Sequence, residues 1–284
     1  MKRGRSTPLT IAMLAVLVYF LLPLCWLVVS STKSTSDLFS TFGLWLSDAP
    51  QLWTNVGATL SHDGGVFIRW LFNTAIYAVV SALGSALVAA AGGYGFAKFR
   101  FRGDRAAFNL VLGAIMVPTT ALAIPTYLLF AKVGLVNTPW AVILPSLVSP
   151  FGLYLMRIYA EDAVPDSLVE AARIDGAGEL QIFVRIALRL LAPGLVTVVL
   201  FTLVATWNNY FLPLIMLNDP KLYPITVGLA SWASQAVGGG SGSNSDLLAL
   251  VVTGSTLSVI PLIVAFVLLQ RYWQSGLATG GVKQ

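Results

Sequence analysis

Six long, strongly apolar stretches of this sequence contain no charged residue, and they limit what the chain can fold into. Each is longer than the ~20 residues that a helix needs to cross the hydrocarbon core of a bilayer. Only 10% of the 284 residues are charged and 57% are hydrophobic, a composition far from that of a soluble domain. We therefore predict an all-α, polytopic membrane protein. The charge-free stretches are residues 6–32, 70–97, 106–131, 133–156, 190–218 and 247–270.

These stretches predict a single transmembrane domain over residues 1–284, with six transmembrane helices. The first is expected to be an uncleaved helix, because its apolar run is longer than the apolar region of a signal peptide and no small-residue cleavage site follows it. The spans are expected at roughly residues 9–30, 71–96, 107–131, 136–157, 191–216 and 247–270.

The basic residues predict the orientation of the chain. Loops on the side of the N-terminus carry thirteen Lys and Arg residues, and loops on the other side carry four. Cytoplasmic loops are enriched in these residues, so both termini are expected in the cytoplasm. The thirteen are Lys2, Arg3, Arg5, Lys98, Arg100, Arg102, Arg105, Arg157, Arg173, Arg185, Arg189, Arg271 and Lys283, and the four are Lys33, Arg69, Lys132 and Lys221.

This topology predicts the outcome of cysteine labelling. A membrane-impermeant thiol reagent added from outside should label a cysteine at Ser243, because the Gly/Ser-rich loop 236–246 is expected on the outer side. The same reagent should not reach a cysteine at Gly178. The opposite labelling pattern would overturn the orientation.

An acidic cluster marks the loop over residues 158–190. Half of the twelve carboxylates of the chain lie between residues 161 and 179, and hydrocarbon does not hold such a cluster. The pattern predicts two short helices around a turn, in which Gly176 tolerates a positive φ and ends the first helix. One interpretation is a solvated hairpin in which Glu170 pairs with Arg173 at i+3.

The second interpretation comes from a resemblance. Residues 170–194 read EAARIDGAGELQIFVRIALRLLAPG, which resembles the cytoplasmic EAA signature of bacterial ABC-importer permeases. That signature is EAA, three residues, Gly, nine residues, then Ile-x-Leu-Pro. Arg189 stands where the family usually has proline, so the chain departs from the pattern there. Residues 170, 171, 172, 176, 186 and 188 match.

The resemblance implies that the loop is a coupling helix that docks on a separate ATPase subunit. The docking residues it implies are Glu170, Ala171, Ala172, Asp175 and Gly176. It also implies that the C-terminal tail, with Gly280, Gly281 and Lys283, is directed toward the ATPase.

Further segments resemble the carbohydrate branch of that family. They are GLVNTPWAVILP at 134–145, WNNYFLPL at 207–214, YPITVGL at 223–229 and the ending SGLATGGVKQ at 275–284. The resemblance implies a permease subunit for a sugar or oligosaccharide in the bacterial inner membrane. It implies as partners a second permease, two ATPase subunits and an extracytoplasmic solute-binding protein.

Polar residues inside the spans are candidates for the translocation path. Adjacent amides both donate and accept hydrogen bonds, and neighbouring aromatic rings can stack on sugar faces. The same groups can instead join neighbouring helices. The candidates are Asn73, Asn208, Asn209 and Tyr210.

Missing motifs limit the other functions. No G-x-x-x-x-G-K-[ST] loop is present, so we expect no cofactor on this chain, with ATP and Mg²⁺ on the partner ATPase. The lone His62 has no partner histidines or cysteines, so no metal site is expected, and dispersed basic residues argue against nucleic acid. Alternatives that stay open are a permease for another solute such as glycerol phosphate, a secondary transporter that needs no ATPase, and a membrane scaffold.

Overall fold

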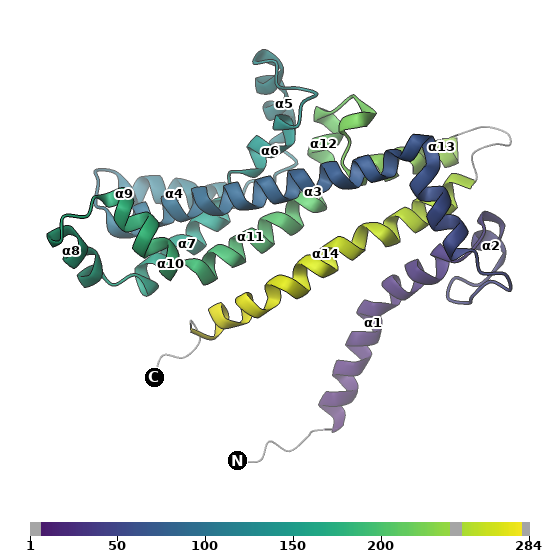
Figure 1. Cartoon of the computed structure of the whole chain (residues 1–284), viewed down its shortest axis with the longest axis horizontal. Helices are drawn as coiled ribbons and strands as arrows, with labels where there is room; N and C mark the ends of the chain where they lie inside the picture. The colour runs from purple at the N-terminus through teal and green to yellow at the C-terminus, as the bar shows by residue number, and fades with distance from the viewer. Residues whose placement is uncertain (1–6, 239–245, 280–284) are drawn as a thin grey trace. The chain divides into compact units, whose positions relative to one another are not determined.

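The computed structural model describes residues 7–238 and 246–279, with side chains over 7–238 and 246–270. Every regular element in these residues is helical, which confirms the all-α class (Figure 1). Ser243 and the tail residues Gly280, Gly281 and Lys283 lie outside the described residues. The chain divides into unit 1, residues 1–69 and 228–261, and unit 2, residues 70–227 and 262–284.

Unit 1 contains the N-terminal helices and the second helix from the C-terminus. Its elements are α1 (Thr7–Ser31), α2 (Thr35–Ser40), the first part of α3 (Leu52–Lys98), most of α13 (Ile225–Gly238) and the first half of α14 (Asp246–Thr279). Helix α3 is kinked here, because Asp63, Gly64 and Gly65 all have positive φ.

Buried Lys33 organises the segment between α1 and α3. Its ammonium donates to Thr41 Oγ1 and to the Phe42 carbonyl, both at 2.9 Å. The Asn55 amide donates to the carbonyls of Ser31 and Lys33, also at 2.9 Å. A buried cation is tolerated when oxygen acceptors replace its hydration, so these bonds fix how the chain leaves α1.

Unit 2 contains the rest of α3 and the elements of the central third of the sequence. They are α4 (Asp104–Ile115), α5 (Ala123–Lys132), α6 (Trp140–Ser146), α7 (Pro150–Ala163), α8 (Asp166–Ile174), α9 (Glu179–Ile182), the π-helical turn η1 (Phe183–Ala187), α10 (Leu188–Leu190), α11 (Ala192–Trp207), α12 (Phe211–Met216) and the 3₁₀ turn η2 (Pro220–Leu222).

Two hydrophobic clusters hold unit 2 together. The larger joins α3 to α7, α8, α9 and α11 through residues such as Tyr94, Met156, Val169, Ile182 and Val198. The smaller surrounds Tyr77 with side chains from α5, α6, α12 and the segment after α12. The helices of the central third are therefore divided into two packed groups.

Six continuous spans are not confirmed by this structure. Within the described residues, four helical stretches are long and apolar enough to cross a membrane, or five if the bent pair 179–190 and 192–207 is one span. The four are Thr7–Ser31, Leu52–Lys98, Trp140–Ala163 and Asp246–Gln270. The predicted helix over 107–131 is wrong as a continuous element, since residues 116–122 separate α4 from α5, and the one over 191–216 is broken at 208–210.

Proline explains these breaks. Pro118 disfavours helical backbone at the residue before it, and α4 ends in a tight turn with Val117 N–H on the Ala114 carbonyl. Pro213 has no N–H to give the Asn209 carbonyl four residues earlier. The hydroxyl of Thr226 donates to that carbonyl instead, at 2.7 Å. A break is stable where another segment satisfies the freed carbonyl.

Glycine permits a close approach of α3 to α7. A Cβ at Gly93 would lie 2.6 Å from Arg157 N and 2.6 Å from Met156 C, both of them main-chain atoms. Gly95, two residues further on, has nothing within 4 Å of its Cβ position. Of these two residues, only Gly93 must lack a side chain for α3 and α7 to pack.

We predict that Gly93→Ala destabilises the protein by about 1–3 kcal/mol, since the added methyl group forces α3 and α7 apart. Gly95→Ala is the matched control and should be neutral or slightly stabilising, because alanine favours a helix more than glycine does. Thermal unfolding of the purified protein in detergent measures both. Equal unfolding temperatures for the two variants would contradict the close approach.

Candidate functional site

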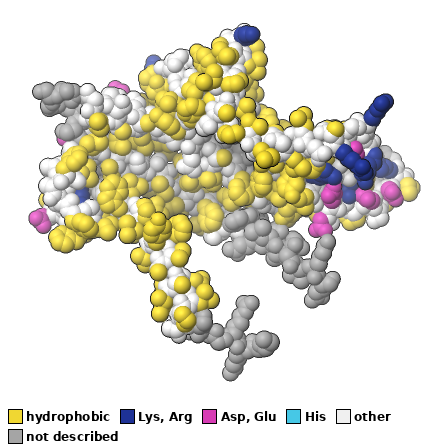
Figure 2. All heavy atoms as spheres, turned by 180° about the vertical axis from the view of Figure 1, so that it is seen from behind, with side chains coloured by type: hydrophobic (Ala, Val, Ile, Leu, Met, Phe, Trp, Pro, Cys, Tyr) yellow, Lys and Arg dark blue, Asp and Glu magenta, His cyan; other side chains and the backbone are white. Residues whose placement is uncertain are grey.

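The loop between α7 and α11 forms the most charged part of unit 2. Figure 2 shows basic and acidic side chains gathered in one region of the visible surface, beside a largely hydrophobic area. In Figure 1 this is the region in which α8 and α9 lie, beyond the C-terminal end of α3. The loop predicted over residues 158–190 is therefore a distinct helical structure.

Helix α8 is amphipathic, and its two faces have different surroundings. Val169 and Ala172 are buried in the larger hydrophobic cluster. Glu170 and Ala171 are exposed on the other face. Of the residues that the EAA resemblance implies for docking, Glu170, Ala171 and Asp175 are therefore accessible, whereas Ala172 packs inward.

The turn after α8 forms as predicted. Gly176 has φ +83°, and Asp175 caps the helix with its N–H on the Ala171 carbonyl. The N–H of Gly176 bonds Arg173 O at 3.0 Å, and that of Ala177 bonds Ala172 O at 2.9 Å. These two bonds make a Schellman motif, which satisfies the last carbonyls of α8.

The predicted pair between Glu170 and Arg173 is wrong. Arg173 binds Glu179 across the turn, with Nε on Oε1 at 2.7 Å and Nη2 on Oε2 at 3.3 Å. This two-point contact matches the planar fork of the guanidinium, and the hydrogen bond raises the pKa of Arg173. Glu170 makes no ion pair within the described residues.

A long-range ion pair fastens α8 to α3. Lys98 Nζ lies 2.6 Å from Asp166 Oδ1, and the lysine side chain is only 6% exposed. The hydrogen bond from Lys98 and its charge lower the pKa of Asp166 from its ordinary value of 3.8. The ion pair therefore stabilises the fold at neutral pH, and this contribution is lost as the pH falls through the lowered pKa. Sequence reasoning missed this contact, because 68 residues separate the partners.

The path candidates lie at two places in unit 2. Asn208, Asn209 and Tyr210 form the break between α11 and α12, where Asn208 and Tyr210 are exposed. The side-chain amide of Asn208 donates to the Val204 carbonyl at 2.9 Å. Asn73 lies on α3 and donates to two main-chain carbonyls, at Lys221 and Tyr223. Its amide nitrogen is therefore occupied by contacts within the chain.

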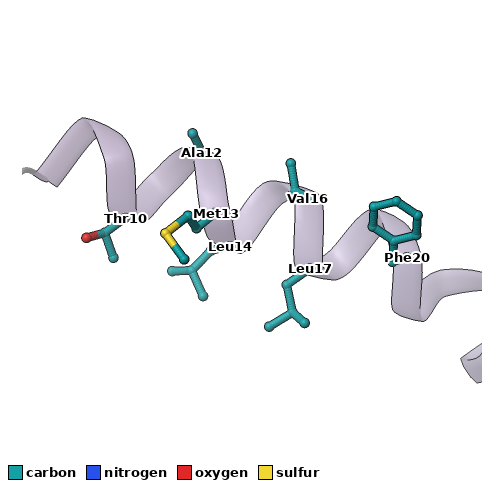
Figure 3. A pocket seen from close by; sticks show the side chains of 7 residues that line it. All are labelled: Thr10, Ala12, Met13, Leu14, Val16, Leu17 and Phe20. Atoms are coloured by element: carbon teal, nitrogen blue, oxygen red, sulfur yellow. The ribbon is translucent and has the colours of Figure 1, made fainter. Parts of the chain in front are cut away.

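One further hollow lies along α1 in unit 1 (Figure 3). All of its lining residues belong to this single helix, and most are apolar. It lacks the convergent polar groups of a solute site. The surface suits lipid or another apolar helix. The lining residues are Thr10, Ala12, Met13, Leu14, Val16, Leu17 and Phe20.

Long apolar helices, broken spans and a charged amphipathic hairpin define a polytopic membrane protein. The family profile described as "Binding-protein-dependent transport system inner membrane component" matches residues 82–278. The chain belongs to this family. It is a permease subunit of an ABC importer, a multi-pass membrane protein whose ATPase is a separate subunit.

Individual relatives agree with this assignment. The arabinooligosaccharides transport system permease protein AraQ of Bacillus subtilis is 32% identical over 97% of this chain and 95% of its own length. The maltodextrin transport system permease protein MdxG of the same species is 32% identical over 86% and 87%. A crystal structure of a bacterial ABC transporter involved in the import of the acidic polysaccharide alginate contains a similar chain. Its TM-score is 0.78 at 25% identity, covering 96% of this chain and 99% of that one.

Gly176 and Gly178 provide a matched test of the turn. Neither has an atom within 4 Å of its Cβ position, but only Gly176 has positive φ. We predict that Gly176→Ala costs about 1–2 kcal/mol locally, the energy of left-handed backbone for an L-residue. Hydrogen exchange at Ala177 should then be about tenfold faster or more. Gly178→Ala should leave the exchange unchanged, and an equal effect of both variants would contradict the motif.

Proposed function

We propose that this chain forms half of the translocation pore of a bacterial importer for a sugar or oligosaccharide. A second permease forms the other half, two ATPase subunits bind at the cytoplasmic side, and an external protein delivers the solute. The names of the relatives favour a carbohydrate: arabinooligosaccharides for AraQ, maltodextrin for MdxG and lactose for LacG of Rhizobium radiobacter. The excess of basic residues on one side supports cytoplasmic termini and a cytoplasmic α8.

The observation that carries the docking role is the exposure of apolar side chains on the most charged loop. Ile174 is 86% exposed and Leu180 is 76% exposed, on either side of the Gly176 turn. Exposing two large apolar side chains to water beside Glu170 is unfavourable for a loop that contacts only solvent. Apolar side chains rimmed by charges are typical of a protein interface. We assign the occupant as the ATPase subunit, with Glu170 paired to a basic residue of its cleft.

The break at 208–210 supports a role in the translocation path. Irregular backbone at membrane depth is tolerated where protein surrounds it or where it lines a water-filled cavity. The exposed Asn208 and Tyr210 at this break offer an amide and a ring to a hydroxyl-rich solute. Asn209 lies between them. Asn73 contributes to such a path only through its amide oxygen, since its nitrogen is bonded to Lys221 and Tyr223.

The rival functions differ in what drives uptake. A secondary transporter would carry ionisable residues in its spans for ion coupling. The six apolar stretches that predict the spans of this chain contain no charged residue. A permease for glycerol phosphate would keep the ATPase and change only the solute. A panel of mono- and oligosaccharides together with glycerol phosphate therefore distinguishes these functions. Uptake into vesicles is measured with the purified complex and its binding protein, with and without ATP.

We predict that Glu170→Ala weakens ATPase binding by about tenfold or more, because truncation leaves the partner's charge unpaired at a desolvated interface. Solute-stimulated ATP hydrolysis and uptake should fall together. Asp162→Ala is the control, since it removes another exposed carboxylate of the same loop that lies outside α8. Normal hydrolysis and uptake in Glu170→Ala would contradict the docking role of Glu170 and favour a loop that contacts only solvent.

A further inference from the structure

Helix α3 is the unbroken span of unit 2. Of the six charge-free stretches, the second alone contains no proline. After the kink at 62–65, no further residue of α3 leaves helical backbone. From Trp70 to Lys98 the helix extends about 42 Å at about 1.5 Å per residue. It is therefore a rod that connects the two packed groups of unit 2.

One face of the rod holds the segment that follows α12. Trp70, Asn73, Thr74 and Tyr77 follow the i, i+3, i+4, i+7 pattern of a single helix face. Trp70 Nε1 donates to Pro220 O at 2.9 Å, and Tyr77 Oη donates to Leu222 O at 2.9 Å. We call these four side chains the clamp.

The two central members of the clamp complete the contact. The Asn73 amide donates to Lys221 O at 2.9 Å and to Tyr223 O at 3.0 Å. Thr74 Oγ1 accepts from Ile225 N at 2.7 Å and donates to Trp70 O at 2.8 Å. Every hydrogen bond from the clamp to the segment is therefore to its main chain, which fixes the position of the backbone.

Asn137 holds the start of the same segment. Its Oδ1 accepts from the N–H groups of Asn218 and Asp219, both at 2.9 Å, and its own N–H donates to Met216 O at 2.8 Å. Asn137 has φ +59°, a left-handed conformation that asparagine tolerates. The shape of residues 216–225 is thus set by α3 and by Asn137 rather than by the segment alone.

The other end of the rod is fastened to the coupling loop. Gly93 brings α3 into main-chain contact range of α7, and Lys98 forms the 2.6 Å ion pair with Asp166 at the start of α8. Tyr94 packs on Phe183 of η1, with ring centroids 5.3 Å apart. Both ends of the straight part of α3, residues 70–98, are therefore fixed to segments on which the proposed function depends.

The chain itself also connects α8 to residues 216–225, through α9 to α12, but this connection is interrupted twice. From the coupling loop to residue 216 it passes through a bend of 78° before α11 and through the break at 208–210. A bent and broken route absorbs a displacement, whereas a continuous helix held at both ends transmits it. The clamp and the Lys98–Asp166 pair therefore define the stiffer connection.

We propose that α3 is a rigid link that moves residues 216–225 together with α8 during the transport cycle. This proposal rests on the proposed function, because α8 is taken as the site that the ATPase moves. In the proposed orientation residues 216–225 lie on the outer side, so the link connects ATP-driven movement of α8 to the face where solute arrives. Trp70, Asn73, Thr74 and Tyr77 act as positioning residues.

A distance measurement tests the link. Spin labels are placed at Ser167 on α8 and at Lys221, both exposed, in the complete complex in nanodiscs. The distance distribution is expected to be narrow and the same without nucleotide and with ATP. A shift of several ångströms on ATP binding to the unmodified complex would overturn the proposal.

The clamp is then weakened by the double variant Thr74→Val, Tyr77→Phe, which keeps the side-chain shapes and removes three hydrogen bonds. The distance distribution should broaden and change with nucleotide. Stimulation of ATP hydrolysis by the loaded binding protein should fall about 5-fold or more. Ser81→Ala is the control on the same helix, since the buried Ser81 hydroxyl has no hydrogen-bond partner among the described residues. An unchanged distribution and full stimulation in the double variant would also overturn the proposal.

The inner end provides a second variant that leaves the core untouched. The Asp166 side chain is 81% exposed, so Asp166→Ala breaks the ion pair without leaving a cavity. It should broaden the same distance distribution, and Asp162→Ala should not. If Asp166→Ala leaves the distribution narrow, the link does not act through Lys98. If the complex takes up none of the solutes in the panel, that result contradicts the proposed transport function. It does not affect the test of the link, because the distance measurement requires ATP but no solute.

Discussion

Main-chain hydrogen bonding inside a membrane is the constraint on which the rest of unit 2 depends. Each proline in a span removes one donor and leaves one carbonyl without its helical partner. Hydrocarbon offers no water to replace it, so another segment of protein must. At the Pro213 break Thr226 supplies the donor for Asn209 O, and the uninterrupted α3 supplies donors for residues 220–223. The break at 208–210 is therefore stabilised by a donor from α13, and the segment after α12 is stabilised by donors from α3.

Local chemistry explains why the structure of the charged loop over residues 158–190 is predictable from sequence. The amphipathic period of α8, the end of the helix at Gly176 and the new start at Glu179 all depend on residues within a few positions of each other. The structure agrees with each of these predictions. The transmembrane character of the chain is equally local, since it follows from charge-free length alone.

Long-range contacts explain what the sequence does not reveal. Charge spacing favours the pair Glu170 with Arg173, but the turn brings Glu179 closer in space, and its carboxylate accepts both guanidinium bonds. The partners of Trp70 and Tyr77 lie about 150 residues away, and no periodic pattern encodes them. Apolar composition continues through the breaks in the third and fifth spans, so charge-free length alone does not reveal them, although Pro118 in the third span is a helix-breaking residue visible in the sequence.

The departure at Arg189 shows how the backbone accommodates a residue that differs from the EAA signature. The bend of 78° occurs without proline at this position, because it falls two residues later, at Leu191 between α10 and α11. Pro193 lies in the first turn of α11, where its missing N–H would have bonded the Arg189 carbonyl. That carbonyl is therefore released whether or not residue 189 is proline. Arg189 itself is exposed, whereas Leu191 is buried in the larger hydrophobic cluster.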